Sequence, residues 1–253
     1  MKKLLGMLVA GSCVASASAT TVFMDTFDYA DDAALAAVWD QGSANPSYTH
    51  DAAFGNPAGS YSMPSPAGSF QGRRAVNLGA DYNPTNANPL VFSYDMYLPE
   101  DVAGAWNGAR HYLELRGYAG DAFGSGGLEN LVSMGIYNTS DDTFSTLSYQ
   151  GRVTFGSNWN TLDEEAGAPT RSMGWHAMQI EITGDEIRFS VDGTLAEVEA
   201  RPNGFGFDSI VLGSDLSANG WNVSVDNVKL EVVPEPATLA LLALGGLAAF
   251  RRR

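Results

Sequence analysis

Thiols, basic residues and histidines are scarce in this chain of 253 residues. The one cysteine, Cys13, lies close to the N-terminus, so the body can hold neither a disulfide framework nor a cysteine-ligated zinc ion. The three histidines show no His-x-x-x-His or His-x-x-Glu-His spacing, which argues against a zinc hydrolase. With 14 Lys and Arg against 29 Asp and Glu, the formal net charge is −15. Such an acidic chain cannot neutralise a phosphate backbone, so nucleic acid is a poor partner.

Motifs for nucleophilic catalysis and phosphate binding are also absent. No Gly-x-Ser-x-Gly turn occurs, and no glycine-rich loop leads from a strand into a helix. The sequence therefore gives no support to acyl transfer or nucleotide binding, and we expect a protein that is not an enzyme.

Residues 1–19 have the order of a cleaved secretory signal. Lys2 and Lys3 precede a mostly apolar run at 4–15, and the small residues Ala17 and Ala19 predict cleavage after Ala19. A buried N-terminal helix and lipidation of Cys13 are the alternatives. If the signal helix is removed, the mature protein has no thiol, and its stability rests on packing and metal rather than on disulfides.

Residues 234–253 combine three elements at the C-terminus. Pro234, Glu235 and Pro236 precede an apolar run, and Arg251, Arg252 and Arg253 follow it. This order resembles the PEP-CTERM sorting signal of Gram-negative bacteria that make extracellular polysaccharide. The resemblance implies recognition and cleavage near the motif by a membrane-embedded exosortase, which frees the body for export or surface attachment. An unprocessed one-pass anchor is the alternative.

The length of the apolar run fits a transient anchor. A helix over 237–250 would span about 21 Å at about 1.5 Å per residue, which is shorter than the roughly 30 Å hydrocarbon core. The terminal arginines hold the end of this short transmembrane helix at the cytoplasmic face. Lys2 and Lys3 start on that face too, so the body lies across the membrane.

Without its two ends, the chain keeps 9 basic and 28 acidic residues, a net charge of −19.

Residues 20–233 indicate one antiparallel β domain, because short alternating runs recur between glycine, asparagine, aspartate and proline. A short helix is expected at 33–39, capped by Asp31 or Asp32. The dense glycine, serine, asparagine and proline at 40–89 predict long surface loops. Strands are expected at 21–27, 90–98, 112–117, 131–137, 144–155, 175–183, 186–191, 194–199, 209–213 and 222–232.

Two tight turns are expected in the second half of the body. Gly184 and Asp185 separate two alternating strands, and glycine at the first position suits a type II′ turn. Asp192 and Gly193 provide a second turn into the strand at 194–199. We find no internal repeat, which argues against a propeller or a solenoid.

A second resemblance covers most of the body in order. The segments 174–176, 189–193 and 225–230 look like the second half of a concanavalin-A-like, laminin-G-like jelly roll. Asp25 to Tyr29 with Ala34, Leu35 and Trp39 is similar to the start of many secreted bacterial members. The fold class implied is an antiparallel jelly-roll β-sandwich. Jelly-roll carbohydrate-binding modules often hold calcium where the first and last strands pair, and the matching positions here are Asp25 or Asp28 and Asp226.

The acidic residues do not form the pattern of a glycosidase on this fold. The Glu-x-Asp-x-x-Glu string of that branch is absent, and Glu114 is a lone acid in its strand. Glu197 and Glu199 have the even spacing of one sheet face, which is typical of a solvated face. His176 is expected to be a half-buried sheet residue.

Aromatic residues carry the remaining signal, since sugar rings stack on exposed Trp and Tyr. Trp106 and Trp159 lie among small polar residues and are candidate platforms for polysaccharide, although packing under a loop is an equal alternative. Trp39, Trp175 and Trp221 are expected in the core. The sequence thus predicts an exported surface or matrix protein with a structural or carbohydrate-binding role, and structural calcium as its one candidate cofactor. The alternatives are a secreted glycosidase or lyase and a purely structural protein without a ligand.

Overall fold

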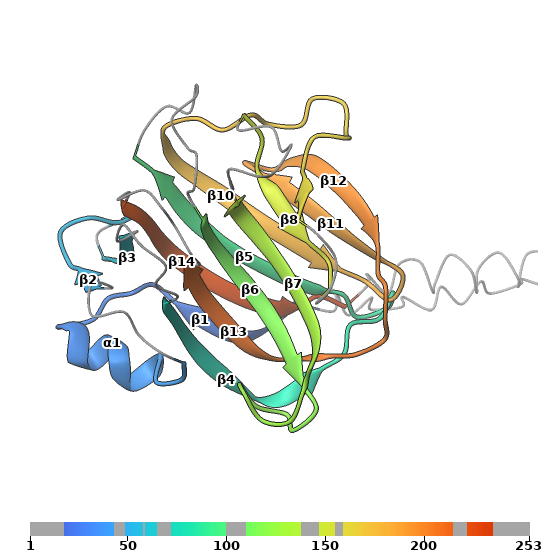
Figure 1. Ribbon diagram of the computed structural model, residues 1–253, viewed down its shortest axis with the longest axis horizontal. Helices are drawn as coiled ribbons and strands as arrows, with labels where there is room; N and C mark the ends of the chain where they lie inside the picture. The colour runs from blue at the N-terminus through green and yellow to red at the C-terminus, as the bar shows by residue number, and fades with distance from the viewer. Residues whose placement is uncertain are drawn as a thin grey trace, which may run out of the picture.

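The computed structural model describes residues 18–42, 49–57, 59–64, 72–99, 110–137, 147–154, 159–214 and 222–234. These residues form two antiparallel sheets and one short helix (Figure 1). The larger sheet has the order β12-β11-β10-β5-β14-β3-β2, with β1 also paired to β14. Its strands are β1 (Thr20–Asp25), β2 (Thr49–Asp51), β3 (Ser60–Pro64), β5 (Leu90–Leu98), β10 (Gly174–Ile182), β11 (Glu186–Val191), β12 (Thr194–Ala200) and β14 (Asn222–Val232).

The smaller sheet has six strands in the order β4-β13-β6-β7-β8-β9. They are β4 (Gly72–Tyr82), β6 (Arg110–Tyr118), β7 (Leu128–Tyr137), β8 (Gln150–Arg152), β9 (Asn160–Thr161) and β13 (Phe207–Ser214). Neighbours such as β5 and β14, or β4 and β13, lie far apart in sequence, so the chain crosses repeatedly between sheets. The antiparallel sandwich predicted from the sequence is confirmed.

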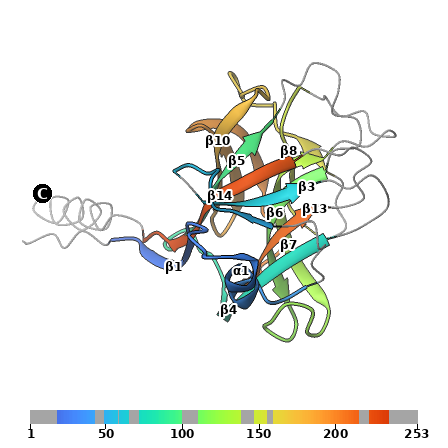
Figure 2. The same cartoon turned by 90° about the vertical axis from the view of Figure 1, so that its left-hand side faces the viewer.

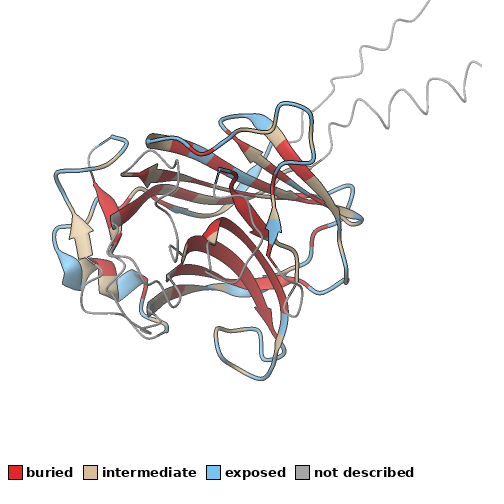
Figure 3. Cartoon of the chain, turned by 45° about the horizontal axis from the view of Figure 1, so that its top comes forward, coloured by how far each residue is buried: buried red, intermediate tan, exposed pale blue. Residues whose placement is uncertain are grey.

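The inner faces of the two sheets enclose the hydrophobic core. Strand β5 alternates strictly between buried and half-buried residues, as expected for a strand with one face in the core. Tyr94 from β5 is 1% exposed, and its hydroxyl donates to the Met134 carbonyl on β7 of the opposite sheet at 2.6 Å. Figure 3 shows the buried residues concentrated on the facing strands.

The two ends of the body pair with each other. Strands β1 and β14 are antiparallel, with Thr20 opposite Val232, and they lie side by side in Figure 2. Ala19 is exposed directly before β1, and the Val233 amide donates to the Pro89 carbonyl at 2.9 Å just after β14. The segments that precede β1 and follow β14 are therefore attached at the same end of the sandwich.

The two terminal helices that the sequence predicts lie outside the described residues, and so do Ala17, Glu235, Pro236 and the three terminal arginines. Within the described ranges, the structure contains no helix with the length and apolar character needed to cross a membrane. Helix α1 (Asp32–Val38) begins after Asp31, whose carboxylate accepts from the Ala34 amide at 2.9 Å and caps the first turn.

The prediction of long loops at 40–89 is wrong, because β2, β3 and β4 lie in this segment. Strand β4 is an edge strand of the smaller sheet, and only part of its inner face reaches the core. Its sequence therefore lacks the regular apolar alternation by which strands are recognised. The strand expected at 144–155 is shorter than predicted, since the described part contains only Gln150–Arg152 as β8.

The first of the two predicted turns differs in detail from the expectation. Gly184 does not have the positive φ of a type II′ turn, because the Thr183 hydroxyl accepts from the amides of Asp185 and Glu186 and shapes the turn. A Cβ at Gly184 would lie 2.9 Å from the side-chain oxygen of Asn86, which would have to shift. At the second turn, Asp192 and Gly193 have φ of 51° and 74°, as a type I′ turn requires.

Candidate functional site

The outer face of the smaller sheet carries a polar cluster on its central strand. Leu113 and Leu115 of β6 belong to the core, so the alternate residues Tyr112, Glu114 and Arg116 point to the opposite side of the sheet. All three are at most 7% exposed. Charged residues such as Glu114 and Arg116 are rarely buried unless they are paired. Their burial on the side of the sheet that faces away from the core shows that other side chains cover this face.

Strand register assembles the cluster in two rows across the sheet. One row contains Arg73 (β4), Gly213 (β13), Tyr112 (β6), Gly135 (β7) and Gln150 (β8). The next contains Ala75, Val211, Glu114, Ser133 and Arg152 on the same five strands. The site is thus built from strands that are far apart in the chain.

Glu114 is the centre of the cluster. Its carboxylate accepts from Arg116 Nε at 2.6 Å and from the Ser133 hydroxyl at 2.7 Å. A second nitrogen of Arg116 completes a forked ion pair, and the same guanidinium donates to the Tyr118 hydroxyl at 3.1 Å. Burial lowers the pKa of Arg116, but the Glu114 carboxylate and the Tyr118 hydroxyl together outweigh burial and raise this pKa above its ordinary value. The hydrogen bonds therefore fix both side chains in place.

An aromatic wall stands beside this pair. Trp159 stacks on Tyr137 with ring centroids 4.4 Å apart and an interplanar angle of 8°, and it lies 5.0 Å from Tyr112. The Arg110 guanidinium lies 4.8 Å from the centre of the Tyr137 ring. Trp159 is only 6% exposed, so it is a wall of the site rather than the open platform predicted. Trp106, the other predicted platform, lies outside the described residues.

The remaining tryptophans divide between core and surface. Trp39 is fully buried, as expected. Trp175 instead lies half-buried on the outer face of the larger sheet, stacked on Phe54 with centroids 5.5 Å apart. The prediction for Trp175 is wrong because β10 turns alternate residues outward and His176 takes the inward position. Trp221 lies outside the described residues.

Two glycines let the Tyr112 ring lie against the sheet. A Cβ at Gly213 would come within 3.0 Å of the ring, and one at Gly135 would come within 2.7 Å of the Tyr112 Cα. Gly135 also has a φ of 153°, which side-chain-bearing residues rarely adopt. These glycines therefore form the floor beneath the aromatic wall.

The cluster borders a cavity of about 120 Å³. One buried water needs about 10–15 Å³ of such space, so the cavity has room for several water molecules or for part of a larger ligand. Glu114 is the one carboxylate among the described residues that line it, against the three guanidinium groups of Arg73, Arg116 and Arg152. Guanidinium groups thus outnumber carboxylates among the described lining residues.

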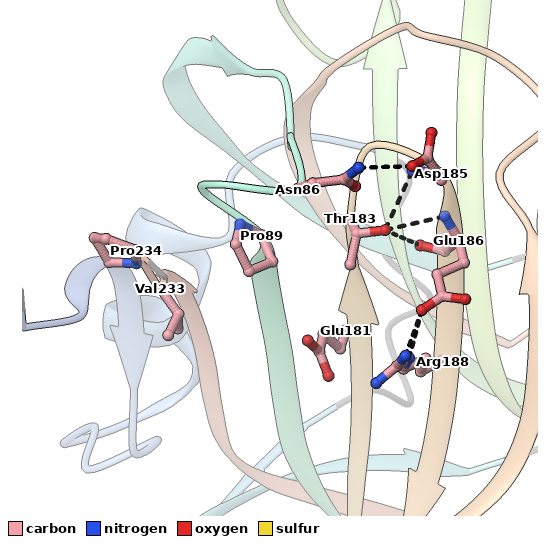
Figure 4. Close-up of a pocket in the computed structure, with 9 residues that line it drawn as sticks. All are labelled: Asn86, Pro89, Glu181, Thr183, Asp185, Glu186, Arg188, Val233 and Pro234. Carbon is pink, nitrogen blue, oxygen red and sulfur yellow. Dashed lines mark hydrogen bonds and ion pairs between the residues drawn. The ribbon is translucent and has the colours of Figure 1, made fainter. Parts of the chain in front are cut away.

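A larger cavity of about 600 Å³ lies where the sorting tail leaves the sandwich (Figure 4). It is lined by Val233 and Pro234, by the β10–β11 turn and by the loop before β5. Two pairs of its polar groups are joined: Arg188 with Glu186, and Asn86 with Asp185 at 2.6 Å. This cavity lies at the junction between the body and the tail.

The three carboxylates predicted to hold calcium have different surroundings. Asp25 is 9% exposed and accepts from the Phe27 amide at 2.7 Å, from Trp39 Nε1 at 2.6 Å and from the Tyr29 hydroxyl. Asp28 is exposed and accepts from the Thr26 hydroxyl at 3.3 Å. Among the described residues, no group of three His, Cys, Asp or Glu side chains is arranged to hold a metal ion. Calcium stays a prediction from the sequence.

Asp226 lies at a bulge of β14 and is 1% exposed. Its carboxylate accepts from the amides of Asn56 and Asn227, each at 2.7 Å. Burial raises its pKa, the two amides oppose this, and the nearby Asp95 and Asp28 raise it further. Its hydrogen bonds fix the 52–57 loop against the larger sheet.

Sequence reasoning missed a cluster of Ser172, His176 and Asp192. His176 is 8% exposed; its Nδ1 lies 2.8 Å from Asp192, and its Nε2 lies 3.2 Å from the Ser172 hydroxyl. The hairpin register was the available signal, because Met178 pairs with Val191 and so brings Asp192 close to His176.

The geometry of this cluster opposes catalysis. Nε2 lies only 2.9 Å from the Ser172 carbonyl oxygen, which can accept but not donate. Because the Asp192 carboxylate also accepts, at Nδ1, both contacts are satisfied only by a ring that donates from both nitrogens, and such a ring has no lone pair to take the serine proton. We assign His176 as a clamp between the segment before β10 and the β11–β12 turn.

Glu197 and Glu199 do not form the solvated face predicted from their spacing. Glu197 is 2% exposed, lies opposite the buried Phe189 and accepts from the Glu164 amide at 3.1 Å. Burial raises the pKa of Glu197 to about 7. The spacing predicted a shared face correctly, but the loop after β9 covers that face.

Comparisons with known proteins support both parts of the chain. Residues 232–253 match the family model of the PEP-CTERM protein-sorting motif, which implies export and exosortase-dependent sorting to the cell surface or extracellular space. No curated protein sequence matches the chain.

Solved structures support the sandwich. A Bacillus subtilis protein with a galectin-like fold matches with a TM-score of 0.53 and 10% identity, covering 87% of this chain and 100% of the other. An endo-1,3-β-glucanase from Streptomyces sioyaensis matches with a TM-score of 0.51 and 13% identity, covering 88% and 100%. At these identities the likeness concerns the fold alone. The chain therefore joins a β-sandwich, similar to the galectin-like fold, to a C-terminal PEP-CTERM sorting motif.

Proposed function

We propose that this protein is an exosortase-sorted surface or matrix protein whose sandwich binds polysaccharide without cleaving it. The observation that carries the proposal is the cavity on the outer face of the smaller sheet. It combines a fixed Glu114–Arg116 pair with a wall of Tyr112, Tyr137 and Trp159. Directional polar groups beside aromatic rings are what recognition of a sugar requires.

The charge pattern favours binding over hydrolysis. Glycosidases use two carboxylates, about 5–5.5 Å apart in retaining enzymes and about 6.5–9.5 Å apart in inverting ones. Among the described residues that line the cavity, Glu114 is the one carboxylate, and it forms a forked pair with the Arg116 guanidinium. A carboxylate held in this way is poorly suited to donate a proton to a leaving group. A secreted glycosidase or lyase is the second candidate, kept because sandwiches of this fold include a glucanase.

Attachment of both terminal segments at one end of the sandwich fits this role. Thr20 and Val232 pair at the junction with the tail, whereas the cavity is built from the middle of the smaller sheet. A body that is held near the membrane by its tail thus keeps a separate face for matrix polymer, before and after processing.

The test compares two half-buried tyrosines on opposite sheets of the exported protein. Tyr137→Ala removes the partner of Trp159, and Tyr97→Ala is the matched control on the larger sheet. We expect Tyr137→Ala to weaken polysaccharide binding about three- to tenfold, equivalent to about 1 kcal/mol of stacking. Thermal unfolding of both variants checks that they are folded. Equal affinities of the two variants and the unchanged protein would rule out this cavity as the binding site.

A further inference from the structure

The chain is held in the sandwich up to the last residue before the sorting motif. Val232 pairs with Thr20 of β1 on one side and with Leu90 of β5 on the other. The amide of Val233 donates to the Pro89 carbonyl at 2.9 Å. No residue up to Val233 can therefore enter the cleft of an enzyme unless the end of β14 leaves both neighbouring strands.

The motif follows the sandwich without a linker. Pro234, Glu235 and Pro236 alone separate Val233 from the apolar run that begins at residue 237. An extended chain advances at most about 3.6 Å per residue, so this run starts within about 14 Å of Val233. An enzyme that cleaves near the motif must therefore reach the surface of the sandwich itself.

The surface at this point is the junction cavity of about 600 Å³. Figure 4 shows Val233 and Pro234 on one side of it and the β10–β11 hairpin on the other. Its volume lies in the range of about 300–1,000 Å³ that is typical of binding pockets. The cavity therefore has room for side chains of a partner, directly beside the first residue of the motif.

Carboxylates outnumber basic groups in the described lining of this cavity: Glu181, Asp185 and Glu186 stand against Arg188. Arg188 Nε donates to Glu186 at 2.8 Å, and Asp185 accepts from Asn86. Glu181 lies opposite Arg188 in the strand register, yet no hydrogen bond or ion pair joins its carboxylate to another described residue (Figure 4). The lining thus offers a carboxylate to a basic group of a partner, and it repels an anionic lipid surface.

We propose that the junction cavity is the surface on which the exosortase docks when it processes the tail, with a basic group of the enzyme opposite Glu181. This inference rests on the sorting part of the proposed function and names the face of the body that sorting uses. Docking beside Pro234 holds the motif at the enzyme, so the body raises the effective concentration of its own cleavage site. The polysaccharide cavity lies on the smaller sheet, so the two surfaces can be occupied together.

The experiment follows cleavage of the full chain in cells that contain an exosortase, by pulse-labelling and by the mass of the exported product. Glu181→Lys places like charges face to face, so we expect processing to slow about tenfold or more. Glu129→Lys is the matched control, because it reverses the same charge at an exposed position of the smaller sheet and should leave the rate unchanged. Thermal unfolding of the exported variants checks that they are folded.

A second variant leaves the body intact and moves the motif away from it. Insertion of about six glycine and serine residues between Val233 and Pro234 should slow processing several-fold, because the linker lowers the effective concentration of the motif at a docked enzyme. Processing of this variant that is as fast as that of the unchanged chain, or faster, overturns the inference, since the enzyme then needs free chain and not the body.

The remaining outcomes separate other occupants of the face and the proposed function. Faster processing of Glu181→Lys overturns the inference and identifies the anionic membrane surface as the occupant. A dimer of the exported body that Glu181→Lys dissociates also overturns it and assigns the face to a second copy. Absence of processing in the unchanged chain, or equal processing in Glu235→Ala, counts against the sorting part of the proposed function itself.

Discussion

Replacing Asp25 tests whether this carboxylate is a hydrogen-bond centre of the fold or a calcium ligand. Asp25→Ala removes the acceptor of the Phe27 amide and of Trp39 Nε1, and both donors belong to residues that are fully buried. A buried donor without a partner costs about 1–3 kcal/mol, so the two together cost about 2–6 kcal/mol. This is a large part of the 5–15 kcal/mol that stabilises a typical domain. Asp25→Asn keeps one acceptor and costs about half as much.

The assay is urea unfolding, with the free energy of unfolding extrapolated to water. Asp28→Ala is the control, because Asp28 is exposed and accepts one long hydrogen bond; we expect a change below about 0.5 kcal/mol. Each variant is unfolded with calcium and with chelator. An Asp25→Ala effect no larger than that of Asp28→Ala would refute the hydrogen-bond account. An Asp25→Ala effect that disappears in chelator would refute it too and would favour calcium.

Two further predictions concern clusters that the structure revealed. Because the pKa of Glu197 is raised to about 7 in the folded protein and is about 4.3 in an unfolded chain, its contribution to stability is complete below pH 4 and is lost as the pH rises through 7. Urea titrations should give a free energy of unfolding that is about 1–2 kcal/mol lower at about pH 8 than at about pH 5, after allowance for solvent screening. This difference should be absent in Glu197→Gln. The same difference in both proteins would contradict the prediction. His176→Ala should lower the melting temperature by several degrees, since it removes the clamp to Asp192, whereas Ser172→Ala should leave both stability and any ester hydrolysis unchanged. Loss of a measured esterase activity in Ser172→Ala would instead identify a catalytic serine.

Strands with mostly alternating apolar residues were predictable from the sequence. Strands β5, β11 and β14 begin and end at the predicted residues, because one face of each lies in the core and each is flanked by turn residues. The cap of α1 by Asp31 was also predictable from local chemistry. Strand β4 was not, because its alternation is carried largely by arginine, asparagine and small residues.

The candidate site was predictable only in part. Tyr112, Glu114 and Arg116 alternate with two leucines in β6, which indicates a polar outer face, but a sequence pattern does not show that this face is enclosed. Arg73 and Arg152 join it through pairing of strands that lie dozens of residues apart. The polar neighbours of Trp159 leave open an exposed platform or packing under a loop, and they do not show that Tyr137 and Tyr112 cover it.

The most direct test of the account is a titration of the exported protein with polysaccharide while new reducing ends are counted in the same mixture. The account predicts saturable binding, weakened in Tyr137→Ala, with no increase in reducing ends over the time of the experiment. A steady increase in reducing ends that depends on Glu114 would contradict it and identify the protein as a glycan-cleaving enzyme.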